Sequence, residues 1–127
     1  MKKIEGHTSA FMDDLLGIDD AVGISEKIKN DAAVLPTITQ HAINRAKFVN
    51  PKLNAIAVED FDGAIARAKN PIQGNFYGVP TFIKDTDEVT GMPLYLGSRA
   101  LPTLSGKRNW LAPQGAPEEE NTRCPGG

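Results

Sequence analysis

The chain has 127 residues and a formal net charge of −2, which gives no electrostatic case for binding nucleic acid or an anionic membrane. With 40% hydrophobic and 24% charged residues, it has the composition of one soluble globular domain with a core of its own. Its single cysteine, Cys124, excludes an internal disulfide, and no apolar run has the length of a membrane span, so we expect a cytoplasmic protein.

The sequence predicts a first helix from Asp20 or Ala21 to Lys29 and a third from Phe61 to Lys69. Asp20 and Asp60 precede these helices, and their carboxylates suit the free N–H groups of a helix N-terminus. In both helices apolar side chains recur every three or four residues and so share one face. These faces consist of Ala21, Ile24 and Ile28 in the first helix and of Phe61, Ile65 and Ala68 in the third.

A second helix is predicted over residues 37–49. Thr37 and Gln40 have the spacing of a capping box, and Asn50-Pro51 is expected to end the helix. The buried stripe of this helix is predicted to consist of Ile38, Ala42, Ala46 and Val49. His41 lies beside the stripe without a second metal-ligating residue at a suitable spacing, so we interpret it as structural or exposed.

Two apolar runs of strand length, Leu53–Val58 and Val79–Ile83, predict buried strands. The expected order is therefore helix, helix, strand, helix, strand, which is typical of α/β packing. Residues 72–77 are expected to form a loop before the second strand, and residues 90–93 a turn after it.

Lys84 follows directly after the second predicted strand. Because side chains alternate along a strand, Phe82 and Lys84 share a face, which places the amine beside an aromatic ring. Desolvation there favours the neutral amine, and a neutral lysine can act as a general base. Composition alone favours the other interpretation, a solvated lysine at the surface.

Several motifs occur in one order along this part of the chain: Val49–Ala55, Gly78-Val79-Pro80, Ile83-Lys84-Asp85, Gly91-Met92-Pro93 and Gly97-Ser98. Together they resemble the N-terminal segment of the amidase-signature enzymes, from about Phe11 to Pro102. The resemblance implies an α/β fold with helices packed on a mixed sheet, of which this chain holds only the N-terminal portion. It also implies that Lys84 is the catalytic lysine of a Ser–cis-Ser–Lys triad.

The activity that the resemblance implies is hydrolysis of a carboxylic amide at a non-peptide C–N bond. The substrate is a small-molecule amide, and neither a cofactor nor a metal is implied. In the family, the neutral lysine takes a proton from the cis-serine, which takes one from the nucleophilic serine. The serines of this chain are Ser9, Ser25, Ser98 and Ser105, and none stands in the family's glycine- and serine-rich context. We therefore expect a truncated fragment that lacks the nucleophile and is inactive alone.

Two other interpretations remain open. The chain can be a segment of an amidotransferase subunit, which uses the same triad to deliver ammonia to another reaction. It can also be a non-catalytic module that binds a partner or ligand. If the isolated chain folds on its own, that favours the non-catalytic module. Co-purification with a partner subunit or tRNA favours the amidotransferase subunit.

Three carboxylates, Asp85, Asp87 and Glu88, follow Lys84 without the spacing of an EF-hand, so no metal site is predicted. Asp85 is instead expected to accept hydrogen bonds from backbone N–H groups.

Residues 1–103 are predicted to form the N-terminal part of an amidase-signature domain. Residues 104–127, rich in Pro, Gly and Glu, are predicted to form an irregular, disordered tail. Because the covering part of the fold is absent, we also expect the fragment to self-associate through unpaired strand edges and apolar faces.

Overall fold

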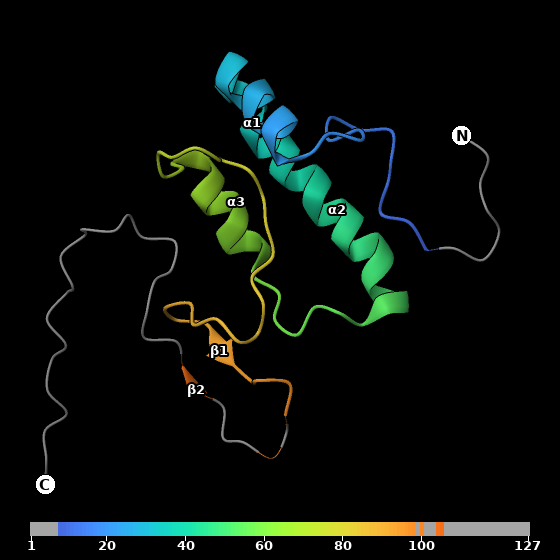
Figure 1. The fold of residues 1–127 in the computed structure, drawn as a ribbon, viewed down its shortest axis with the longest axis vertical. Helices are drawn as coiled ribbons and strands as arrows, with labels where there is room; N and C mark the ends of the chain where they lie inside the picture. Colours follow the sequence, from blue (N-terminus) through green and yellow to red (C-terminus); the bar gives the residue numbers. More distant parts are fainter. Residues whose placement is uncertain (1–7, 99, 101–103, 106–127) are drawn as a thin grey trace, which may run out of the picture.

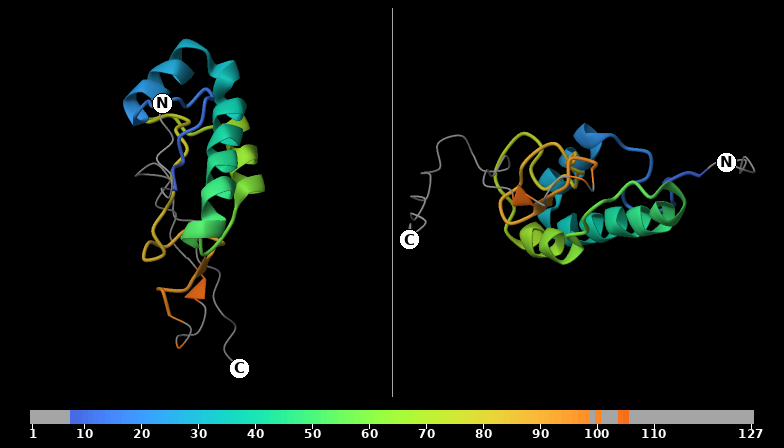
Figure 2. Two further views of the ribbon diagram at one scale, coloured as in Figure 1. Left: turned by 90° about the vertical axis from the view of Figure 1, so that its right-hand side faces the viewer. Right: turned by 90° about the horizontal axis from the view of Figure 1, so that it is seen from below.

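The computed structural model describes residues 8–98, 100 and 104–105. The elements in chain order are α1 (Ala21–Asn30), the 3-10 turn η1 (Ala32–Val34), α2 (Leu35–Leu53), α3 (Phe61–Lys69), β1 (Pro93–Leu94) and β2 (Leu104–Ser105). Helix α3 runs beside α2, and α1 lies near the N-terminal end of α2 (Figures 1 and 2). None of the helices in these described ranges combines the length and the apolar character needed to cross a membrane.

The apolar core lies where the helices meet the loop before Gly78. Its buried members are Leu16, Ile28, Leu35, Ile38 and Ala68. Ile28 and Ile38 are both 0% exposed, and Tyr77 and Val79 pack against this cluster from the loop. The segment that leads to Lys84 is therefore attached to the core just before it reaches that residue.

Helix α1 forms as the sequence predicts. The carboxylate of Asp20 accepts a hydrogen bond from the N–H of Gly23 at 2.9 Å, which confirms it as the N-cap. Ile28 is buried and Ile24 partly buried, whereas Ala21 at the helix start is exposed. The helix extends one residue beyond the predicted Lys29, to Asn30.

The predicted capping box at Thr37 is wrong. Helix α2 begins at Leu35, and the residue at its N-cap, Val34, makes no side-chain capping bond. The chain enters α2 from the 3-10 turn, whose first residues are capped by Asp31, and Pro36 fits the first helical turn because its missing N–H has no partner there. The buried stripe includes the predicted Ile38 and Ala46, and also the unpredicted residues Leu35, Thr39 and Ile43.

The predicted end of α2 and the strand after it are also wrong. The helix continues through Pro51 to Leu53 and ends at Asn54, which adopts a left-handed φ of 49°. The side chain of Asn50 then accepts hydrogen bonds from the N–H groups of Ala55 and Ile56 at 3.0 and 3.1 Å. These donors are satisfied locally, so no strand forms over Leu53–Val58.

Helix α3 has the predicted bounds, but Asp60 does not cap it. The carboxylate of Asp60 instead forms an ion pair with Arg67 at 2.8 Å. Ala68 is the buried residue of the predicted face, and Phe61 and Ile65 are partly buried. The ring of Phe61 also faces α2, since the Lys47 ammonium lies 5.1 Å from its centre.

The second predicted strand, Val79–Ile83, does not form either. Strands β1 and β2 pair antiparallel, with Pro93 opposite Ser105, and are the only sheet in the ranges that the structure describes. A strand needs a paired strand for its N–H and C=O groups, and among the described residues none pairs with residues 79–83. The predicted mixed sheet is thus not seen here. Residues 106–127, most of the predicted tail, lie outside the described residues.

Candidate functional site

Lys84 lies on an extended segment between the helical core and β1. The residues before it, Thr81 to Ile83, are exposed. Phe82 is 67% exposed, so its ring does not bury the Lys84 amine. The Lys84 side chain is itself exposed, and its ammonium has no hydrogen-bond or ion-pair partner in the part of the chain that the structure describes. In this structure Lys84 therefore has the solvated setting, not the covered one that a buried strand would provide.

Gly78 attaches the lysine segment to the core. It has a φ of +72°, and a Cβ built on it would lie 2.5 Å from the Cδ1 of Leu35. Only glycine meets both requirements, because other residues rarely adopt this φ and none fits so close to a buried side chain. Nearby, the buried Ser25 donates a hydrogen bond to the carbonyl of Asn75 at 3.1 Å, which ties the same loop to α1.

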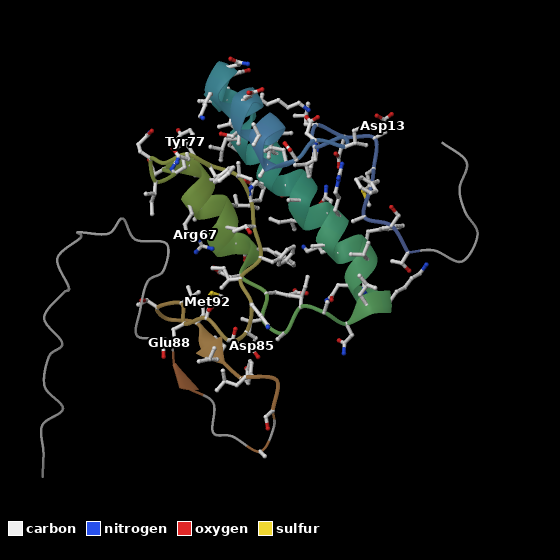
Figure 3. The ribbon with its side chains drawn as sticks, viewed as in Figure 1. Asp13, Arg67, Tyr77, Asp85, Glu88 and Met92 are labelled. Atoms are coloured by element: carbon white, nitrogen blue, oxygen red, sulfur yellow. The ribbon has the colours of Figure 1, made fainter. Side chains whose placement is uncertain are left out.

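Asp85 joins the Lys84 motif to the Gly97-Ser98 motif. Its Oδ1 accepts a hydrogen bond from the N–H of Tyr95 at 2.9 Å, and its Oδ2 accepts one from the N–H of Gly97 at 3.0 Å. We call this pair of bonds the Asp85 clamp; Figure 3 shows Asp85 beside β1. The prediction that Asp85 binds backbone N–H groups is confirmed.

The turn before β1 forms where the Gly91 motif predicts it. Gly91 has a φ of +79°, and the N–H of Met92 donates to the carbonyl of Val89 at 3.0 Å. The chain therefore reverses between Lys84 and Tyr95, which allows the Asp85 clamp to close.

His41 is structural, as predicted. Its Nδ1 accepts a hydrogen bond from the N–H of Leu15 at 3.1 Å, which ties the N-terminal segment to α2.

No group of three or more metal-ligating side chains gathers among residues 8–98, 100 and 104–105. Hollows are present in this part of the chain, and two of them lie near the helices. A hollow of about 290 Å³ is lined by Lys47, Phe61 and three acidic residues, and contains none of the motif residues. A groove of about 260 Å³ is mostly apolar and includes Pro80 and Phe82, which precede Lys84.

The sequence did not indicate which N–H groups Asp85 would bind. In the structure these N–H groups belong to a turn at Leu96-Gly97, where both residues have a positive φ, of 53° and 65°. A leucine in this region is uncommon, so Leu96 marks a backbone that other contacts hold in place.

The Amidase family model matches residues 37–107, more than half of the chain, and includes Lys84 and the Asp85 clamp. The chain belongs to this family.

Two curated relatives are proteins named "Putative amidase AmiC". The chain is 43% identical over 91 residues to the one from Mycobacterium leprae and 44% identical over 93 residues to the one from Mycobacterium tuberculosis H37Rv. Each match covers 72% of this chain, but only 19% and 20% of the relative. No solved structure matches the chain.

A third relative is the indoleacetamide hydrolase of Bradyrhizobium diazoefficiens. It is 30% identical over 115 residues, which is 84% of this chain and 21% of that protein. The chain thus spans 19% to 21% of the length of these curated relatives.

Proposed function

We propose that the chain provides the N-terminal segment of an enzyme that hydrolyses a small-molecule carboxylic amide, with Lys84 as the proton acceptor. One observation carries this proposal: the Lys84-Asp85 and Gly97-Ser98 motifs are joined by the Asp85 clamp, inside the region that the family model covers. The names of the relatives support an amide as the substrate class.

The chemistry proposed for Lys84 is proton transfer. As a neutral amine it takes the proton of a cis-serine, which in turn takes the proton of the serine that attacks the amide carbonyl. The developing oxyanion is stabilised by backbone N–H groups. Lys84 supplies the base, and the two serines come from the part of the enzyme that the relatives have and this chain does not match.

We propose that the chain alone does not hydrolyse amides. Three of the serines have hydroxyls whose hydrogen bonds the structure describes, and their partners are backbone groups. Ser25 donates to the carbonyl of Asn75, and the Oγ atoms of Ser9 and Ser98 accept hydrogen bonds from the N–H groups of Phe11 and Ala100. In none of these three bonds is the partner Lys84.

The same proposal accounts for the missing mixed sheet and for the exposed apolar surface. Phe82 at 67% exposure and Ile83 at 38% flank the lysine segment, and Phe11 at 59% lies on the N-terminal segment. We propose that the remaining part of the enzyme pairs with residues 79–83 and covers these side chains. Without that part, the apolar surface favours self-association of the fragment.

A chimeric enzyme tests the proposed activity. Residues 8–98 would replace the matching segment of the M. tuberculosis relative, and hydrolysis of indoleacetamide and of simple aliphatic amides would be measured. We expect Lys84→Ala and Lys84→Arg to lower kcat by at least about 100-fold, since arginine keeps the charge but does not accept a proton. A Lys84→Ala chimera as active as its parent would overturn the proposal.

A further inference from the structure

The Asp85 clamp spans the loop that follows Lys84. Its two oxygens bind N–H groups 10 and 12 residues further along the chain. Both bonds, at 2.9 and 3.0 Å, have the usual length of an N–H···O hydrogen bond, and the acceptor in each is a carboxylate oxygen. The residue next to Lys84 is therefore fixed to the turn that leads into Ser98.

The backbone that the clamp holds is a strained one. Leu96 lies between the two N–H donors, and its φ of +53° is followed by +65° at Gly97. The N–H groups of Tyr95 and Gly97 both point at one carboxylate from this turn. The Asp85 carboxylate therefore stabilises a backbone conformation that Leu96 alone does not favour.

A second bond fixes the same point of the chain. The carbonyl of Lys84 accepts a hydrogen bond from the N–H of Asp87 at 2.9 Å. On its other side, residues 81–83 are exposed and belong to no helix or strand. Beyond the attachment of Gly78 and Val79 to the core, the hydrogen bonds that hold the Lys84 backbone are therefore those that follow it.

We propose that Asp85 is a positioning residue for Lys84. It contacts neither substrate nor the transferred proton, and it acts by holding the Lys84 backbone against the Tyr95–Gly97 turn. A base must lie within hydrogen-bond reach of its proton donor, so a lysine on a long side chain depends on a fixed backbone. This role rests on the proposed function, in which Lys84 accepts a proton.

The clamp itself is tested by amide hydrogen exchange on the 127-residue chain. In Asp85→Ala, the amides of Tyr95 and Gly97 should exchange at least about tenfold faster, while the amides of α2 keep their protection. Asp87→Asn is the matched control, because it removes a nearby charge and keeps the backbone N–H. Unchanged exchange at Tyr95 and Gly97 would overturn the proposal.

Asp85→Asn covers the case in which the alanine variant fails to fold. The carboxamide keeps one acceptor oxygen and turns an NH2 group toward the other N–H donor. We expect one of the two amides to lose protection and the other to keep it. Protection of both would contradict the clamp.

The positioning role is tested in the chimeric enzyme. Per mole of folded enzyme, Asp85→Asn should lower kcat by about 10- to 100-fold with KM little changed, and Asp85→Ala should lower it further. Asp87→Asn should match the parent. A purely structural role would reduce the yield of folded enzyme but leave its kcat intact.

Failure of this inference is distinguishable from failure of the proposed function. If Lys84→Ala is inactive while Asp85→Ala retains the parent kcat, the lysine acts as proposed and Asp85 does not position it. If Lys84→Ala retains the parent kcat, the proposed function itself fails, and the positioning role fails with it.

Discussion

Arg45 on α2 binds the carboxylate of Asp14 through both its Nε and its Nη2, at 2.9 and 2.5 Å. Its Nη2 also donates to the carbonyls of Met12 and Gly17. The two side chains are only 13% and 12% exposed. This one guanidinium therefore holds the segment before α1 against α2, and so covers the part of the core around Leu16.

Breaking this ion pair should destabilise the fold. Asp14→Asn removes the charge from a mostly buried pair and leaves Arg45 without a carboxylate, so we expect the free energy of unfolding to fall by about 1–3 kcal/mol. Asp60→Asn is the control, since Asp60 pairs with the 60% exposed side chain of Arg67 and should cost less than about 1 kcal/mol. Urea unfolding at about pH 7 measures both, and equal losses would contradict the ranking.

The same pair predicts how stability depends on pH. The hydrogen bond from Arg45 holds the pKa of Asp14 below its ordinary value of 3.8, against the opposing effect of burial. Because the folded state has the lower pKa, this stabilisation is present above about pH 3.8 and is lost as the pH falls through the lowered value. Asp14→Asn should lose less stability than the parent over that range, as measured by urea unfolding. An identical acid profile would show that Asp14 does not contribute.

Gly78 and Gly91 form a matched pair for testing the junction with the core. Both have a positive φ, +72° and +79°, but a Cβ on Gly78 would contact Leu35 whereas one on Gly91 meets nothing within 4 Å. We expect Gly91→Ala to cost about 1 kcal/mol from backbone strain alone, and Gly78→Ala to cost about 1–3 kcal/mol more from overpacking. Adding Leu35→Ala to Gly78→Ala should recover part of the extra loss, and additive effects would contradict the contact.

The true start of α2 gives a fourth prediction. Thr37 and Gln40 lie inside the helix, so Thr37→Ala and Gln40→Ala should each change the free energy of unfolding by less than about 0.5 kcal/mol. Ile38, which is 0% exposed, should cost about 2–5 kcal/mol on substitution by alanine. Thermal or urea unfolding measures all three. A loss of about 1 kcal/mol or more in Thr37→Ala would show that Thr37 caps the helix after all.

The helices were predictable because their signals are local. The Asp20 cap and the apolar spacing of α1 lie within ten residues, and the bounds of α3 follow from a similar pattern. Where local signals competed, the prediction failed: Pro36 and the 3-10 turn before it start α2 earlier than Thr37. Pro51 also stays inside the helix, since a proline near the end removes only one hydrogen bond.

The strands and the ion pair were not predictable in this way, because they depend on partners far along the chain. An apolar run such as Val79–Ile83 becomes a strand only beside another strand, and the described residues contain none next to it. Asp14 and Arg45 are 31 residues apart, and nothing local in the sequence links them. In the candidate site, the sequence motif indicated Lys84. It also indicated that Asp85 would bind backbone N–H groups, but not that these would be those of Tyr95 and Gly97.

We propose above that Lys84 belongs to an amide-hydrolysing site of which this chain provides one part. The most direct test measures turnover of one amide, indoleacetamide, by the isolated chain and by the chimeric enzyme, each with and without Lys84→Ala. We predict no turnover by the isolated chain in either form, and turnover by the chimera that Lys84→Ala lowers by at least about 100-fold. Two results would contradict this proposal. One is turnover by the isolated chain that disappears in Lys84→Ala, and the other is a chimera whose turnover is unchanged by Lys84→Ala.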